Sequence, residues 1–299
     1  MIKPILNKSL KELSSMKTGG NAKEVYFPEN TQAMLCLVNE LVMQNKKYTV
    51  LGNMSNVLLP DRGMNIPLVV TTNMKHTCVV SETETTITVF AECGVSITKF
   101  SFEMCKKGYS GLEFSYGIPG SVGGAVYMNA GAYGGEVKDV ITKVKACDKK
   151  GNIFEFTNEE CEFGYRHSRF VNDEYVILGA EFVLTKADAD ECTKNAKEIM
   201  QKRIDKQPLE YPSCGSTFKR PEGFFAGKLI QDSELMGCSI GGAQVSEKHA
   251  GFVINRNNAT TDDVLKLMRY VRKTVYEKFG VMLEEEIKLL DENGEIFKL

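Results

Sequence analysis

Apolar residues that recur every three or four positions predict four helices along this chain. The helices are expected over residues 31–45, 96–107, about 197–206 and 261–279. Thr31 and Ser96 stand where a side chain can cap a helix N-terminus. Gly108 and Gly280 should end the second and fourth helices, and Pro208 should stop the third. Each helix therefore presents an apolar stripe to a core.

Short apolar runs, several of them alternating with polar residues, predict strands between and after these helices. They lie at 24–27, 48–51, 57–59, 68–70, 78–80, 85–91, 137–148, 153–156, 175–184 and 281–290. The polar turn 148–152 should join two of these strands as a hairpin. In the last strand, Leu283 and Ile287 share one face. Glu284 and Glu286 share the other, and periodicity alone therefore predicts that these two glutamates are solvated.

Composition is ordinary for a globular protein of two or three domains, with 299 residues, 42% apolar and 25% charged. A net charge of -2 gives no reason to expect nucleic acid or an acidic membrane as the partner. The sequence shows neither a membrane-spanning apolar run nor a signal-peptide pattern, so we expect a cytoplasmic protein. Nine scattered cysteines without a C-x-x-C pair and three distant histidines predict reduced thiols and no metal site.

A glycine-rich stretch from Gly111 to Gly135 is the main indication of chemistry. Between Gly117 and Gly135 lie 7 of the 26 glycines. Glycine lets backbone N–H groups approach another body closely, and a run of such groups forms a nest suited to phosphate oxygens. Apolar residues punctuate the stretch, which a flexible linker would lack. The alternative is a tightly packed glycine-rich turn without a ligand.

A second glycine-bearing loop, Gly52-Asn53-Met54-Ser55-Asn56, lies between two predicted strands. Its amides and polar side chains could hold a pyrophosphate. It is not a P-loop, because the G-x-x-x-x-G-K-[ST] pattern and a following helix are both lacking. The run Lys17-Thr18-Gly19-Gly20 gives a weaker phosphate signal, for which a plain turn is the alternative.

Two further polar segments carry candidate chemistry. Residues 163–170, FGYRHSRF, form an aromatic and basic loop whose arginines could equally be solvated surface charges. Residues 211–220, YPSCGSTFKR, place a serine in a glycine loop. This is no G-x-S-x-G elbow and no His–carboxylate pair can be placed beside it, which argues against a hydrolase triad and leaves turn chemistry as the alternative.

The stretch GLEFSYGIPGSVGGAVYMNAGAYGGE resembles the flavin-contacting signature of the UDP-N-acetylenolpyruvoylglucosamine reductases, and matching segments extend over nearly the whole chain. The resemblance implies an α+β fold: a two-lobed FAD-binding domain of the vanillyl-alcohol oxidase (PCMH) type and a C-terminal α+β substrate domain. We expect the FAD-binding lobes at 1–75 and 76–192 and the substrate domain at 193–299. The path from Tyr165 to Lys206 resembles the shorter class of the family, which lacks an inserted tyrosine-bearing loop and must close its site by other means.

The resemblance also implies FAD and NADPH as cofactors. The residues expected to bind FAD belong to the two glycine-bearing loops: Gly52, Asn53, Met54, Ser55, Asn56, Gly117, Ile118, Pro119, Gly120, Ser121, Gly123, Gly124, Asn129, Gly131, Ala132 and Tyr133. The family's first loop usually reads Gly-x-Gly-Ser-Asn, and Met54 replaces its second glycine. A positive φ would strain a methionine at that position.

The implied reaction reduces UDP-N-acetylglucosamine enolpyruvate to UDP-N-acetylmuramate in peptidoglycan precursor synthesis. NADPH reduces FAD, and hydride then passes from flavin N5 to the substrate's vinyl group. Matches to family segments select Arg166, Ser216 and Glu286 as catalytic residues. The resemblance implies that the Arg166 guanidinium binds the substrate carboxylate and that Ser216 donates a proton. It implies that Glu286 is an acid with a raised pKa. Further candidate substrate contacts, each cation among them equally able to be a surface charge, are Tyr165, Lys206, His249 and, more weakly, Arg220.

The implied partners are the sugar nucleotide and NADPH, with no nucleic acid, no membrane and a monomeric protein. Cell wall biogenesis, cell shape, the cell cycle and cell division are the implied processes. Three rivals stay open: a different FAD oxidoreductase on the same fold that oxidises a hydroxy acid or an alcohol, a non-enzymatic nucleotide-binding protein, and a glycine-rich globular domain without a ligand. Yellow protein that NADPH bleaches would exclude the second rival.

Overall fold

The computed structural model describes residues 2–299, which form two compact units. Unit 1 contains the first residues up to Pro4 together with Tyr26–Asn53 and Leu68–Lys202. Unit 2 contains Ile5–Val25, Met54–Pro67 and Arg203–Leu299. Because residues 1–75 contribute to both units, the expected division at 75 and 192 does not coincide with them, and it stays a prediction.

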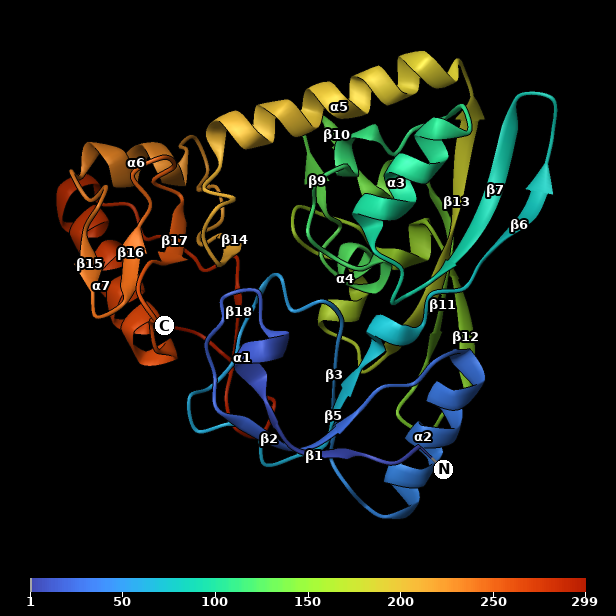
Figure 1. The fold of residues 1–299 in the computed structure, drawn as a ribbon, viewed down its shortest axis with the longest axis horizontal. Helices are drawn as coiled ribbons and strands as arrows, with labels where there is room; N and C mark the ends of the chain where they lie inside the picture. The colour runs from blue at the N-terminus through green and yellow to red at the C-terminus, as the bar shows by residue number, and fades with distance from the viewer. Residues whose placement is uncertain (1) are drawn as a thin grey trace. The chain divides into compact units, whose positions relative to one another are not determined.

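Unit 1 is built on an antiparallel sheet in the order β12-β11-β13-β7-β6, with β8 also paired to β13 (Figure 1). The strands are β6 (Thr77–Glu82), β7 (Thr86–Glu92), β8 (Tyr109–Ser110), β11 (Ile141–Cys147), β12 (Ile153–Thr157) and β13 (Val176–Lys186). β13 is the long central strand and is buried along most of its length. The predicted hairpin is confirmed, because the Asp148 amide donates to the Asn152 carbonyl at 3.0 Å between β11 and β12.

Further elements of unit 1 lie before the glycine-rich stretch in the chain or are formed by it. They are α2 (Thr31–Met43), α3 (Ile97–Lys106), α4 (Val122–Tyr127), the parallel pair β3 (Thr49–Leu51) and β5 (Leu68–Val70), and the two-stranded hairpin β9 (Gly131–Ala132) and β10 (Gly135–Glu136). Ser96 caps α3 as predicted. The cap of α2 is Asn30 rather than Thr31: the Asn30 side chain accepts from the Ala33 amide at 2.9 Å, which makes Thr31 the first helical residue.

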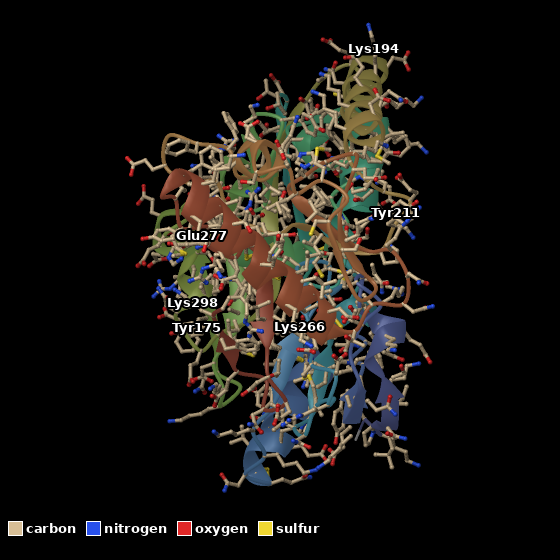
Figure 2. All side chains as sticks on the ribbon, turned by 90° about the vertical axis from the view of Figure 1, so that its left-hand side faces the viewer. Tyr175, Lys194, Tyr211, Lys266, Glu277 and Lys298 are labelled. Atoms are coloured by element: carbon tan, nitrogen blue, oxygen red, sulfur yellow. The ribbon has the colours of Figure 1, made fainter. Side chains whose placement is uncertain are left out.

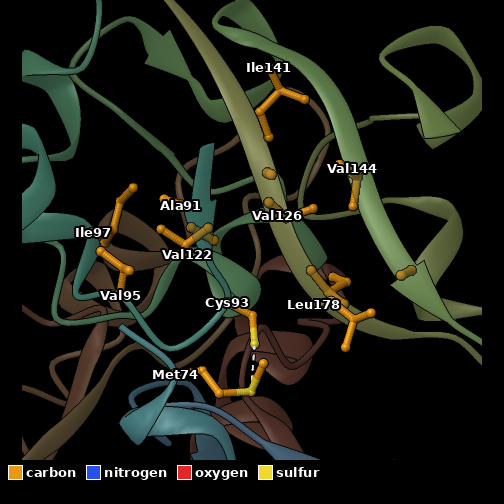
Figure 3. Packing of buried hydrophobic residues seen from close by; sticks show 14 of the residues in the cluster. Met74, Ala91, Cys93, Val95, Ile97, Val122, Val126, Ile141, Val144 and Leu178 are labelled. Carbon is orange, nitrogen blue, oxygen red and sulfur yellow. Dashed lines mark hydrogen bonds between the residues drawn. The ribbon is translucent and has the colours of Figure 1, made fainter. Parts of the chain in front are cut away.

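The core of unit 1 packs α2, α3 and α4 against the sheet. Its buried residues include Val95, Ile97, Val122, Val126 and Leu178, which Figure 3 shows interdigitating around α4 and β13. At the edge of the cluster the Cys93 thiol donates to the Met74 sulfur at 3.7 Å. The segment that follows Gly117 therefore contributes apolar side chains to this core, as its punctuating apolar residues predicted.

A buried carboxylate fastens α2 to β7. Glu92 is 4% exposed and accepts hydrogen bonds from the amide and the hydroxyl of Thr31 and from the amide of His76, at 2.9, 3.1 and 3.0 Å. These three hydrogen bonds satisfy side-chain oxygens that the fold removes from water. The sequence did not reveal this role, because a lone acidic residue at a strand end is normally solvated.

Unit 2 contains a four-stranded antiparallel sheet in the order β14-β17-β16-β15. Its strands are β14 (Ser213–Ser216), β15 (Ser239–Ile240), β16 (Ala243–Val245) and β17 (Phe252–Asn255). The helices α6 (Ala226–Asp232) and α7 (Thr261–Phe279) pack with this sheet around one core. The remaining elements are β1 (Ile5–Ser9), α1 (Leu10–Leu13), β2 (Asn21–Tyr26), β4 (Val57–Leu58), β18 (Lys288–Leu290) and β19 (Ile296–Phe297).

α7 follows its sequence pattern closely. Val264, Leu267, Met268, Val271 and Val275 are buried as predicted, and Gly280 ends the helix at φ 68°. Thr260 supplies the N-cap, and Asp263 completes a capping box. The face turned to solvent carries charged residues such as Lys266 and Glu277, whose side chains project outward in Figure 2.

Two predicted boundaries are wrong. α5 (Ala189–Lys206) begins well before the predicted start near residue 197, because Asp190 and Glu191 occupy its first turn, where negative charge is favourable. The expected strand 281–290 forms a ladder only from Lys288 onward; before it the chain makes one bridge, Phe218 to Glu285, and then bends at Glu286 and Ile287. Its alternation is nevertheless real, because Leu283 and Ile287 are buried.

The pair Gly19-Gly20 is explained by packing within unit 2. A Cβ on Gly20 would lie 2.3 Å from the Asp61 carbonyl oxygen, and one on Gly19 would lie 3.1 Å from Leu10 Cβ. The Gly20 amide also donates to the Pro60 carbonyl at 2.9 Å. Close backbone approach therefore accounts for both glycines without a phosphate.

Candidate functional site

In unit 1 the first glycine-bearing loop meets the second. The Asn53 side-chain amide donates to the Pro119 carbonyl at 2.7 Å, although the two residues are 66 positions apart. A Cβ on Gly52 would lie 2.3 Å from Ser121 Oγ. Only a residue without a side chain lets the Gly52 backbone pass so close to this buried hydroxyl. The structure thus brings together the two segments that the sequence proposed as a diphosphate cradle.

The second loop uses most of its own amides to hold its shape. The amides of Ile118, Gly120, Val122 and Gly123 donate to the carbonyls of Ser115, Ile118, Val95 and Cys93 at 2.8 to 3.0 Å. Ser121 is 2% exposed and its hydroxyl caps α4 by accepting from the Gly124 amide at 3.4 Å. A rigid, internally bonded turn is preorganised for binding a ligand but offers few free donors.

Gly124 is the open position of this turn. It is exposed, and a Cβ built there would meet one protein atom within 4 Å, Ser121 Oγ at 3.6 Å. Gly123 beside it is closed, because a Cβ would lie 2.8 Å from Cys93 Cβ. Open space over glycine backbone, next to the Asn53 contact, fits the diphosphate of a dinucleotide such as FAD.

Met54 adopts the positive φ that would strain a methionine at this position. Its φ is 50°, in the left-handed region that favours glycine. The methionine side chain is 3% exposed and belongs to unit 2, so burial of an apolar side chain can offset the backbone strain. The chain crosses from unit 1 to unit 2 between Asn53 and Met54.

Asn129 links the aromatic and basic loop 163–170 to the hairpin formed by β9 and β10 in unit 1. This buried amide donates to Glu136 Oε2 at 2.9 Å and to the Gly164 carbonyl at 3.0 Å, while its oxygen accepts from the Lys138 amide at 3.0 Å. Asn129 therefore acts as a structural junction, and it positions the segment that carries Arg166.

Arg166 is itself strained and held. Its φ is 52°, and its guanidinium donates to the Gly131 carbonyl at 3.3 Å and lies 5.1 Å from the centre of the Tyr165 ring. Left-handed backbone at a residue other than glycine clusters at functional sites. Nearby, hydrogen bonding from Lys138 holds the pKa of Glu136 below its usual range, with smaller contributions from Asn129 and Arg166.

In unit 2 the segments of Ser216 and Glu286 run side by side. The Glu286 amide donates to the Thr217 carbonyl at 2.9 Å, and the Lys219 amide donates to the Glu284 carbonyl at 2.8 Å. Ser216 and Glu286 are both half-buried. Gly215, just before Ser216, has φ 74°, and a Cβ added to it would have no protein atom within 4 Å. Ser216 therefore follows a glycine with open space around it. The residue after Ser216, Thr217, is joined to Glu286 by a backbone hydrogen bond.

Lys288 and Asn56 complete this part of unit 2. The Asn56 side-chain amide donates to the Glu286 carbonyl at 3.3 Å, and the Lys288 amide donates to the Asn56 carbonyl at 2.9 Å. Burial lowers the pKa of the Lys288 ammonium, as do Lys219 and Lys298, whereas Glu286 opposes this. The sequence did not single out Lys288, although its place two residues after Glu286 on the same face was the available signal.

The candidate substrate cations of unit 2 differ in their surroundings. Lys206 is exposed at the end of α5. The Arg220 guanidinium lies 4.6 Å from the centre of the exposed Phe225 ring. His249 accepts from the Gly251 amide through Nδ1 at 3.1 Å, and burial holds its pKa below the usual value. A neutral His249 can donate through Nε2 but supplies no charge to a diphosphate.

The structure also bears on the other candidate chemistry. All nine cysteines are free thiols, and burial raises the pKa of Cys214, next to Gly215, to about 12. Within residues 2–299, acidic, histidine and cysteine side chains form no group arranged to hold a metal ion. Over the same residues, the helices are too short or too polar to cross a membrane.

Comparison with known proteins agrees with this geometry. A model of an FAD binding domain matches residues 22–157, and a model of the UDP-N-acetylenolpyruvoylglucosamine reductase C-terminal domain matches residues 207–290. The UDP-N-acetylenolpyruvoylglucosamine reductase of Caldicellulosiruptor saccharolyticus is 43% identical over 288 residues, which cover 96% of this chain and 91% of that protein. This chain belongs to the UDP-N-acetylenolpyruvoylglucosamine reductase family.

Other family members support the same assignment. UDP-N-acetylenolpyruvoylglucosamine reductase 2 of Bacillus cereus is 46% identical over 286 residues, covering 96% of this chain and 92% of that protein. The crystal structure of the reductase from Thermus caldophilus superposes with a TM-score of 0.80 at 29% identity, covering 97% of this chain and 98% of that one. The predicted family and the FAD-binding α+β fold with a reductase C-terminal domain are confirmed. The chain is an FAD-dependent oxidoreductase.

Proposed function

We propose that this protein catalyses the NADPH-dependent reduction of UDP-N-acetylglucosamine enolpyruvate to UDP-N-acetylmuramate. Family membership supports the reaction, and one structural observation supports its chemistry most directly. The residues that follow Ser216 and the segment bearing Glu286 are joined by backbone hydrogen bonds at 2.8 and 2.9 Å within unit 2. A proton donor and an acid so joined keep a fixed relative position.

FAD, when bound, supplies hydride transfer between the nicotinamide cofactor and the vinyl group. The residues proposed to bind it belong to the two glycine-bearing loops: Gly52 to Asn56 in the first, and Gly117 to Ser121, Gly123, Gly124, Asn129 and Gly131 to Tyr133 in the second. Their glycine backbone and the Asn53–Pro119 contact support this assignment. Gly123 and Asn129 contribute indirectly, because both are committed to packing or hydrogen bonds inside unit 1.

The substrate carries a carboxylate, and negative charge develops beside it during reduction. Arg166 offers a planar guanidinium that can bind a carboxylate with two parallel hydrogen bonds. Its strained backbone and its bond to Gly131 support a role in which orientation matters. Tyr165 is half-exposed beside it and is proposed as a further substrate contact.

Ser216 is proposed to donate a proton to the carbon that bears the carboxylate. Serine is a weak acid, but a carbanion is a strong base, so the position of the hydroxyl matters more than its acidity. Glu286 is proposed to stabilise the charge on the substrate as a protonated acid, and a raised pKa for it stays a prediction. Lys206 and Arg220 are proposed diphosphate contacts, while neutral His249 is proposed as a hydrogen-bond donor only.

The test is direct turnover. Purified protein loaded with FAD is mixed with NADPH and UDP-N-acetylglucosamine enolpyruvate, and the product is identified by mass spectrometry. The proposal expects NADPH oxidation that requires the sugar nucleotide and a product two hydrogens heavier. Flavin that is bleached by a hydroxy acid or an alcohol, and that the sugar nucleotide does not reoxidise, would instead support another FAD oxidoreductase.

The reaction would place the protein in peptidoglycan precursor synthesis. Its contributions to cell shape, the cell cycle and cell division, and a cytoplasmic location, follow from that placement and stay predictions. A monomeric state also stays a prediction.

A further inference from the structure

A cluster in unit 2 holds the segment that carries Glu286 through the preceding residue, Glu285. It consists of Arg272 on α7, Glu285 and the main chain of Leu299, and we call it the Arg272 clamp. Arg272 Nη1 donates to the Leu299 main-chain oxygen at 2.7 Å and lies 3.5 Å from Glu285 Oε1. The Leu299 amide donates to the same Glu285 oxygen at 2.5 Å. Each of the three groups thus contacts the other two.

The geometry of the extended segment separates the clamp from the chemistry. Successive residues of a chain that bridges a neighbouring segment point to opposite sides, so Glu285, which bridges Phe218, points away from the side of Glu284. The Glu285 side chain is only 9% exposed, whereas its neighbour Glu284 reaches Lys219 at 3.3 Å with a side chain that is 68% exposed. The clamp therefore holds this segment through Glu285, on the side opposite to Glu284.

Glu285 lies between the two hydrogen bonds that join this segment to the strand of Ser216. The bond from Lys219 to Glu284 lies on one side of it and the bond from Glu286 to Thr217 on the other, and Glu285 itself bridges to Phe218. A shift of Glu285 would slide both bonds together. The clamp consequently sets the register of Glu286 against Ser216.

Arg272 lies on α7, a helix that hydrogen bonds hold to other segments of unit 2. At the N-terminal end of α7 the Thr261 hydroxyl donates to the Leu59 carbonyl at 2.6 Å, and the Thr261 and Asp262 amides donate to the two oxygens of Asp61 at 2.9 and 3.0 Å. Arg272 follows the buried Val271 of the same helix. Its Nε also approaches the Met282 sulfur at 3.0 Å. These contacts hold the Arg272 guanidinium in place, so it can in turn hold Glu285.

We propose that Arg272 and Glu285 are positioning residues that hold Glu286 in register with Ser216, an inference that rests on the proposed function. They act through the backbone of residues 284–286. A displacement of about 1 Å at a reacting group can cost about a hundredfold in rate. Loss of the clamp should therefore slow the step that uses Ser216 and Glu286 and spare the reduction of FAD by NADPH.

The experiment compares Arg272→Ala, Arg272→Lys and Lys273→Ala with wild type. Lys273 is the matched control, because it is the next residue of α7 and makes an exposed ion pair with Glu277 at 3.7 Å. The rate of flavin reduction by NADPH and the rate of flavin reoxidation by the enolpyruvyl sugar nucleotide are measured separately by rapid mixing. Amide hydrogen exchange of residues 217–219 and 284–286 supplies a readout that is independent of activity.

We expect Arg272→Ala to slow reoxidation at least tenfold, to leave reduction within about twofold and to accelerate exchange of the Glu286 and Lys219 amides. Arg272→Lys should recover part of the reoxidation rate, and Lys273→Ala should behave as wild type. Reoxidation by Arg272→Ala within threefold of wild type, or an equal loss in both half-reactions, would overturn the inference.

If Arg272→Ala does not fold, Glu285→Gln replaces it. The amide keeps the shape of the side chain and can still accept from Leu299, but it loses the ion pair with Arg272. Reoxidation slowed at least fivefold would support the inference, and an unchanged rate would refute it. Failure of the proposed function gives a different result, because wild type itself would then not be reoxidised by the sugar nucleotide.

Discussion

The substitution Gly124→Ala should strengthen the protein without cofactor and weaken its hold on FAD. Gly124 lies in the first turn of α4, and its φ is not in the left-handed region, so alanine can adopt its backbone conformation. The added methyl group would meet only Ser121 Oγ, at 3.6 Å, which is an ordinary contact. The folded protein therefore has room for it.

The two expected effects have opposite signs. Replacing glycine by alanine in a helix is worth about 0.5–1 kcal/mol, which should raise the midpoint of thermal unfolding by about 1–4 °C. If the FAD diphosphate lies over Gly124, the added methyl group would push the diphosphate away from the hydrogen-bond donors beside it. Loss of one hydrogen bond to a charged group costs about 1.5–3 kcal/mol, which corresponds to an increase of about 10- to 150-fold in Kd for FAD.

The assay pairs thermal unfolding of FAD-free protein with a fluorescence titration of FAD. Gly123→Ala is the contrasting variant, because its Cβ would lie 2.8 Å from Cys93 Cβ and 3.2 Å from the Cys93 carbonyl oxygen. It should lower the unfolding midpoint even without FAD. Wild-type affinity for FAD in Gly124→Ala, with its stability unchanged or raised, would refute a diphosphate site over this turn.

Further predictions concern single side chains. Arg166→Ala should keep bound FAD and its reduction by NADPH but raise the KM for the sugar nucleotide at least tenfold in steady-state assays, and a colourless variant would point to a structural role instead. The folded pKa of His249 is lowered, so its contribution to stability is full above the ordinary value of 6.5 and is lost as pH falls through the folded pKa. Urea unfolding at several pH values should show this loss of stability in wild type. His249→Asn, whose amide oxygen can still accept from the Gly251 amide, should not show it. Equal pH dependence of stability in both proteins would contradict a neutral, buried imidazole.

Local patterns in the sequence predicted the elements that burial enforces. The stripe from Val264 to Val275 and the Ser96 cap appear as expected, because one apolar face or one hydroxyl determines each. Asn30 displaced Thr31 as the cap of α2 because Thr31 is recruited by Glu92, a contact 61 residues away that no local pattern contains.

The candidate site was predictable only in part, for a similar reason. The glycine content of the loops identified two phosphate-binding candidates, and the structure joins them through Gly52 and Ser121. Periodicity described Glu286 as solvated, since the neighbouring Ser216 segment lies 70 residues earlier in the chain. The Arg272 clamp depends on three groups from separate elements, so only the tertiary structure shows it.

The central claim is that Ser216 delivers the proton to the substrate, and Ser216→Ala tests it most directly. FAD-loaded variant and wild type are first mixed with NADPH and then with UDP-N-acetylglucosamine enolpyruvate while flavin absorbance is followed. We predict that both proteins bleach at the same rate and that only wild type recovers its colour, with the variant slowed by about a hundredfold or more. Recovery of colour in Ser216→Ala at the wild-type rate would contradict the claim.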